Sequence, residues 1–95
     1  MMIEHSILKL FIEDTELYEK YHSALKLDFI RENYPTLYRC FKCLPATSIE
    51  GLEATYLANY PVLKDGDRQL IRTLLDNVKA TETDSEAIIT YLESH

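Results

Sequence analysis

The distribution of apolar residues along the chain is the feature that most restricts its fold. Ile3, Ile7 and Leu10 recur at the spacing of one helix face, and no segment of useful length alternates apolar and polar residues as a half-buried strand does. Only two glycines, Gly51 and Gly66, occur in the whole sequence. We therefore predict an all-α fold, a compact bundle of about six short helices that ends in a helical hairpin.

Chain length sets the number of domains. With 95 residues, of which 46% are hydrophobic, the chain can bury a single core and has no room for a second one. We expect one helical domain over residues 1–95, with a globular part at 1–64 and the hairpin at 65–95.

Capping residues and prolines predict the helix boundaries. The acidic segment 13–16 ends the first helix and begins a second one, over roughly 15–25. Asn33 and Pro35 offer the capping oxygen and the preset φ of the next helix start, and Pro45 marks where that helix ends.

Two capping boxes predict the starts of later helices. Thr47 with Glu50, and Thr83 with Glu86, have the spacing at which a hydroxyl and a carboxylate satisfy the free amides of a first turn. Between them, after a turn at 64–67, Asp65 or Asp67 is expected to cap a helix with a wide apolar face. That face consists of Leu70, Ile71, Leu74, Leu75 and Val78.

Charge and targeting signals exclude several classes of function. The formal net charge is −6 and no dense run of Lys or Arg occurs, so tight direct binding to nucleic acid is disfavoured. Glu4, His5 and Lys9 interrupt the apolar N-terminal stretch, which therefore lacks the core of a signal peptide or membrane span. We expect a cytoplasmic protein with no membrane partner.

Cys40 and Cys43 form the one motif with possible redox or metal chemistry. Their C-x-x-C spacing occurs in thiol oxidoreductases, but those place the thiolate at a helix N-terminus, whereas this pair lies in the middle to end of a predicted helix. We expect buried or incidental cysteines, with a redox pair and half of a zinc site as the alternatives. His5, His22 and His95 lack a metal-ligand spacing to complete such a site.

Other catalytic chemistry has little support in the sequence. The acidic residues fall mainly at helix starts, and neither a glycine-rich phosphate loop nor a serine nucleophile motif is present. We predict no catalytic residue, no metal site and no cofactor in these 95 residues. The seven tyrosines are expected mostly at core edges, with a minority in a protein interface.

The chain resembles the N-terminal domain of DnaB-type hexameric replicative DNA helicases. The resemblance begins with a short motif, Glu4-x-x-Ile7-Leu8, and continues through Asp14, Leu17, Asp28-Phe29 and Leu37-Tyr38. Its later part comprises Ser48-Ile49, Leu52, Leu70 to Leu75, Ala87-Ile88 and Tyr91. The chain departs from the family at Lys9, where a glycine is common, and at Tyr34, where a histidine is common. A divergent member, such as a viral helicase, would suit these departures.

The resemblance implies a scaffold role in the primosome during DNA replication. Such domains pair through terminal helical hairpins, form a collar on a hexameric ring, and bind primase or a helicase loader. ATP hydrolysis would belong to a motor domain of the parent helicase outside these residues. We expect this segment to form a homo-oligomer, as a dimer of domains within a hexamer.

A self-association surface is predicted on the last two helices, since the apolar face there is wider than one intramolecular contact requires. Its expected residues are Ile71, Leu74, Leu75, Val78, Ile88, Ile89 and Leu92. Two other functions stay open: a free-standing acidic helical adaptor or inhibitor, and a thiol oxidoreductase using Cys40 and Cys43. Because the chain stops about one turn after Leu92, we also expect a continuing protein as readily as a natural end.

Overall fold

The computed structural model describes residues 3–61 and 65–94, and these contain seven α-helices and one 3-10 turn but no strand. The all-α prediction is confirmed. In chain order the elements are α1 (Ile3–Glu13), α2 (Thr15–Tyr21), η1 (His22–Ala24), α3 (Leu27–Asn33), α4 (Pro35–Lys42), α5 (Ile49–Asn59), α6 (Asp65–Ala80) and α7 (Ser85–Glu93). None of these helices is long and apolar enough to cross a membrane.

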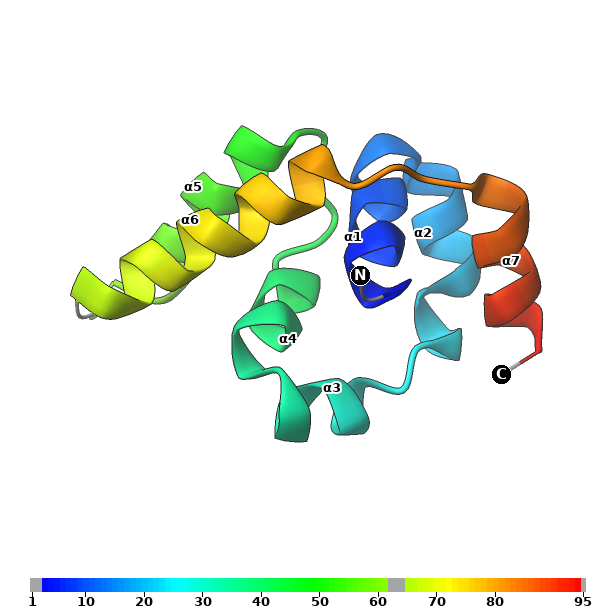
Figure 1. Cartoon of the computed structure of the whole chain (residues 1–95), viewed down its shortest axis with the longest axis horizontal. Coiled ribbons are helices and arrows are strands. Elements are labelled where there is room, and N and C mark those ends of the chain that lie inside the picture. Colours follow the sequence, from blue (N-terminus) through cyan, green and yellow to red (C-terminus); the bar gives the residue numbers. More distant parts are fainter. Residues whose placement is uncertain (1–2, 62–64, 95) are drawn as a thin grey trace.

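Helix α1 lies at the centre of the molecule, between α6 on one side and α2 and α7 on the other (Figure 1). Five of its eleven residues are buried, and they cover more than half of its circumference: Ile7, Leu8, Leu10, Phe11 and Ile12. Helices α2, α4, α6 and α7 all contact it. A helix that is apolar over so wide an arc has to be enclosed by other helices, and α1 is.

The second predicted helix is divided in the structure. Asp14 accepts hydrogen bonds from the backbone amides of Glu16 and Leu17, at 3.1 and 3.2 Å, so the predicted acidic helix start is confirmed. Helix α2 ends at Tyr21, and η1 turns the chain away before residue 25. The separate helix α3, which periodicity did not reveal, then follows with one buried residue, Ile30.

The predicted capping boxes are displaced by one residue. Ser48 rather than Thr47 caps α5, since its Oγ accepts the backbone amide hydrogen of Gly51 at 2.9 Å. Asp84 rather than Thr83 caps α7, and it accepts from the backbone amide of Ala87 at 3.2 Å. Both residues have the extended backbone that an N-cap requires.

Two further capping predictions need correction. The Asn33 side chain donates to the carbonyl oxygen of Phe29 at 2.9 Å, within its own helix, and gives no cap to α4. Pro35 does occupy the first turn of α4, as expected. Asp67 lies inside α6, two residues after its start at Asp65, and so is not its N-cap; the position before Asp65 lies outside the described residues. Residues 65–67, predicted as part of a turn at 64–67, belong to α6, and residue 64 lies outside the described residues.

The helical hairpin predicted for 65–95 is not formed. Helix α6 packs against α1 and α5, whereas α7 packs against the opposite side of α1 (Figure 1). An extended link over 81–84 carries the chain from one side of α1 to the other. Helix α6 pairs with α5, the helix before it, and not with α7. Across that pair Glu53 forms an ion pair with Arg72 at 3.8 Å.

Lys9 fixes the point where α6 ends and the link begins. Its Nζ donates to the carbonyl oxygens of Lys79 and Thr81, at 3.1 and 2.6 Å. Thr81 is buried and donates its hydroxyl hydrogen to the carbonyl oxygen of Asn77 at 2.7 Å. A cation on free carbonyl groups at a helix C-terminus is stabilised both by hydrogen bonds and by the helix dipole.

Replacing Ser48 with alanine should lower the free energy of unfolding by about 1 kcal/mol, because the amide of Gly51 loses its capping acceptor. Thr47→Ala is the matched control, since Thr47 is exposed and does not cap the helix. Urea denaturation of both variants measures the difference. A larger loss for Thr47→Ala than for Ser48→Ala would restore the capping box at Thr47.

Replacing Lys9 with methionine should cost on the order of 1 to 3 kcal/mol, because two carbonyl groups lose a charged donor. Amide hydrogen exchange should rise most in the 81–84 link, which loses its connection to α1. Lys42→Met, at an exposed lysine of α4, is the control. Equal stability of the two variants, with unchanged exchange in the link, would contradict this role.

Candidate functional site

Most of the predicted self-association residues lie in the core of the single chain. Five of them are at most 3% exposed: Ile71, Leu75, Val78, Ile88 and Leu92. Leu74 and Ile89 are half-buried against the same core. The predicted surface is therefore wrong for those five residues. Because Leu75 is part of the core, a charged substitution there would disrupt folding and would give no information on self-association.

Exposed apolar side chains occur elsewhere on the molecule. Among the described residues, the large hydrophobic side chains with the highest exposed fractions are those of Leu70 (58%), Phe29 (52%), Tyr34 (38%) and Leu57 (37%). Single exposed residues are ordinary in soluble proteins, and Leu70 and Leu57 line none of the described grooves. Phe29 and Tyr34 differ, because their rings meet edge to face with centroids 6.3 Å apart, at either end of α3.

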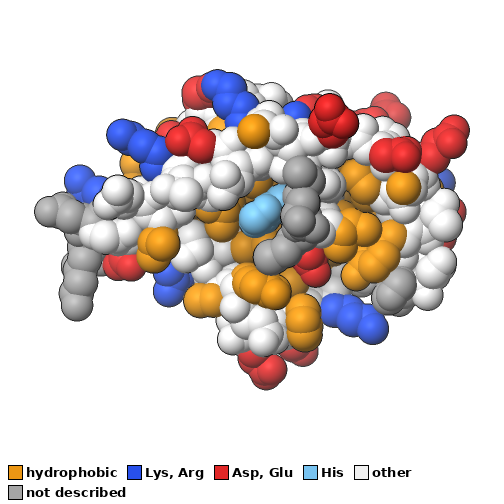
Figure 2. All heavy atoms as spheres, in the orientation of Figure 1, with side chains coloured by type: hydrophobic (Ala, Val, Ile, Leu, Met, Phe, Trp, Pro, Cys, Tyr) orange, Lys and Arg blue, Asp and Glu red, His pale blue; other side chains and the backbone are white. Residues whose placement is uncertain are grey.

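A groove of about 240 Å³ lies beside Phe29. It is bounded by α1, η1, the start of α3 and α7, and its apolar lining comprises Ile7, Ala24, Leu25, Phe29, Ile30 and Tyr91. Glu4 and Lys26 are the charged residues of the lining. Hydrophobic side chains are also visible over the middle of the face in Figure 2, with charged side chains mostly around the edge.

A separate hollow lies beside Tyr34. It has a volume of about 210 Å³ and is lined by Tyr34, Leu37 and Leu74, together with His5 from α1. Burial lowers the pKa of His5 below its ordinary value, against the opposing effect of Glu4. The imidazole is therefore neutral at neutral pH, and the hollow carries no positive charge from it.

Six of the seven tyrosines are buried or half-buried, as expected for core edges. Tyr21 shows the pattern: its ring is buried, and its hydroxyl donates to Glu93 Oε2 at 3.2 Å, joining α2 to α7. Tyr34 is the exposed one. The tyrosine in the best position for an interface is thus the one beside Phe29.

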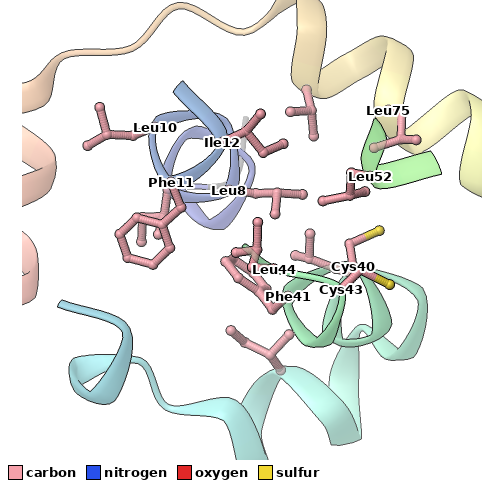
Figure 3. Packing of buried hydrophobic residues seen from close by; sticks show 14 of the residues in the cluster. Leu8, Leu10, Phe11, Ile12, Cys40, Phe41, Cys43, Leu44, Leu52 and Leu75 are labelled. Carbon is pink, nitrogen blue, oxygen red and sulfur yellow. The ribbon is translucent and has the colours of Figure 1, made fainter. Parts of the chain in front are cut away.

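Cys40 and Cys43 lie against the core, and Figure 3 shows both side chains directed to the same side of α4. Burial, with a smaller contribution from the neighbouring Cys43, raises the pKa of the Cys40 thiol to about 12. The pKa of Cys43 is raised by burial too. A nucleophilic or metal-binding cysteine needs the opposite shift, so this environment favours inert thiols. The described residues contain no cluster of three or more potential metal ligands.

Comparison of the chain with protein-family models, with curated proteins and with solved structures found no match in any of the three.

The raised pKa of Cys40 predicts an alkaline loss of stability. The unfolded thiol ionises near pH 8.5 whereas the folded one stays protonated to about 12, so stability is complete below pH 8.5 and falls as pH rises through that window. Wild type should lose roughly 2 kcal/mol more than Cys40→Ala between about pH 8 and pH 10, measured by urea denaturation. Equal losses, or fast alkylation of the native Cys40 thiol at neutral pH, would contradict the buried-thiol assignment.

Proposed function

We propose that this chain is the N-terminal scaffold domain of a DnaB-type replicative helicase. In this role it binds other proteins, among them further helicase subunits and primase or a helicase loader, and it performs no chemistry itself. The single observation that carries the proposal is the placement of the residues on which the resemblance rests.

Those residues have distinct structural roles in the order in which they occur. Ile7 and Leu8 are fully buried on the central helix α1, and Asp14 caps the helix that follows it. Asp28 and Phe29 form the first turn of α3, and Leu37 is buried in the next helix, α4. A resemblance in apolar positions alone could arise in any helical bundle, but a cap, a buried pair and an exposed Phe in series support a common plan.

The departures from the family pattern at Lys9 and Tyr34 have local explanations. Lys9, where a glycine is common in the family, binds the carbonyl groups at the end of α6. Tyr34, where a histidine is common, forms the ring contact with Phe29. Both substitutions therefore fit into this fold without disturbing the helices that bear the resemblance.

Self-association through a hairpin at 65–95 is not part of the proposal, because that hairpin is absent and its apolar residues are core. Subunit contacts would have to use other surfaces, and partner binding would use the groove beside Phe29.

An acidic adaptor is the second candidate, favoured by the concentration of negative charge. Segments 13–21 and 82–93 contain eight of the sixteen acidic residues and a single base, Lys20, giving 1 − 8 = −7 against −6 for the chain. Such a surface would suit an inhibitor that occupies a basic site on another protein.

Sequencing the parent gene past the codon for His95 separates the two candidates. The helicase proposal expects the reading frame to continue through a linker into G-x-x-x-x-G-K-[ST], the phosphate-binding loop of an ATPase motor. A stop codon directly after His95, or a continuing frame without that motif, would overturn the proposal and leave the adaptor in its place.

A further inference from the structure

We propose that the groove beside Phe29 binds an amphipathic helix of a partner protein whose polar face is basic. The inference rests on the proposed function, since it assigns the surface and the chemistry with which this scaffold domain recognises its partner.

The size of the groove suits an anchoring side chain and not a metabolite. Its volume of about 240 Å³ is below the range of roughly 300 to 1,000 Å³ that is usual for small-molecule sites. Six of its eight lining residues are apolar or aromatic, and they come from three stretches that are distant in sequence: α1, residues 24–30 and α7. A shallow apolar groove of this kind accepts one or two large apolar side chains from a partner's helix.

Among the apolar residues of the groove, Phe29 has the most exposed side chain and would gain the most burial from a bound partner. The other two phenylalanines, Phe11 and Phe41, are 1% and 6% exposed, whereas Phe29 is 52% exposed. The next residue, Ile30, is buried, so α3 is anchored in the core while its preceding position faces solvent. The ring contact with Tyr34 extends the apolar surface beyond the groove itself. A rigid pair of aromatic rings at a groove edge has the composition of an interface centre.

The negative charge of the helices beside the groove favours a partner with a basic surface. Helix α7, which contributes Tyr91 to the groove, lies beside α2, to which the hydrogen bond from Tyr21 to Glu93 joins it. These two helices and their flanks carry the net charge of −7 counted above, and acidic side chains gather at the corresponding upper right edge of Figure 2. Glu4 adds a negative charge to the lining. Lys and Arg on the partner's polar face would complement this field.

Lys26 is the positive charge of the lining, and it favours one orientation of the bound helix. The C-terminus of a helix carries a partial negative charge and free carbonyl groups. We therefore place the C-terminal end of the partner helix near Lys26, with its basic residues toward α7.

Other occupants fit these observations less well. A second copy of this chain would bring the same charge of −6 to the same acidic surface. A partner segment added as a β-strand would need a free strand edge, and residues 3–61 and 65–94 form no strand. Anionic lipids and nucleic acids would be repelled by the acidic helices.

Two synthetic helical peptides test the proposal directly. Both share one leucine face, but the polar face is lysine in the first and glutamate in the second. Each is titrated against the full chain by fluorescence anisotropy, in wild type, Phe29→Ser and Leu70→Ser. Leu70 is the matched control because it is at least as exposed as Phe29 but lies on α6, away from the groove.

We expect the lysine peptide to bind wild type and Leu70→Ser equally, and Phe29→Ser roughly tenfold or more weakly, the loss typical of an aromatic anchor. The glutamate peptide should bind at least tenfold more weakly than the lysine peptide, and added salt should narrow that difference. Equal binding of the two peptides, or equal effects of the two substitutions, would overturn the proposal.

Amide chemical shift changes in unmodified wild type give a second measurement that does not depend on either variant folding. With the lysine peptide they should centre on Ala24, Leu25 and Ile30. Changes centred on α5 and α6 would refute the groove as the binding site. Failure of the helicase proposal is read separately, from the reading frame, so a groove that binds peptide in a chain without a motor domain would mark an adaptor.

Discussion

Burial of α1 is the constraint on which the rest of the structure depends. The side chains of Leu8 and Ile12 point toward the side of α1 where Leu52 and Leu75 lie. The side chain of Leu10 points in the opposite direction (Figure 3). The helices on both sides of α1 therefore pack against the same eleven-residue helix. Removing one large buried side chain from such a site usually costs 2 to 5 kcal/mol, a large share of the stability of a domain this small.

The same helix explains why the chain needs no hairpin at its end. A link that crosses from α6 to α7 has to pass the polar arc of α1, and Lys9 occupies that arc between the buried residues. Its hydrogen bonds to the carbonyl groups of Lys79 and Thr81 fix the start of the link against α1. Helix α7 then packs on the far side of α1, where Ile88 and Leu92 are buried. Pairing α7 with α6 would leave α2 to cover that side of α1 alone.

Helix periodicity and capping chemistry were enough to predict the fold class and most helix positions from the sequence. Caps were displaced where two capable residues adjoin, as at Thr47 with Ser48 and at Thr83 with Asp84, because the choice between them depends on backbone angles that the tertiary packing sets. Helix α3 was not predicted because only one of its seven side chains is buried, so its sequence has no repeating apolar pattern. The apolar face of α6 was assigned to a second chain because hydrophobicity is the same whether a residue is buried by its own chain or by another.

The candidate binding surface was less predictable than the core for a related reason. Phe29 and Ile30 are adjacent and both apolar, and the phase of one short helix places the first in solvent and the second in the core. That phase is fixed by what α3 packs against, chiefly α4, and not by local sequence. The groove is accordingly a product of the assembled bundle: Ile7 is at once a fully buried residue of α1 and part of the groove lining. Because the lining and the core share residues, the groove is preformed, and a partner that binds it stabilises the folded chain by mass action.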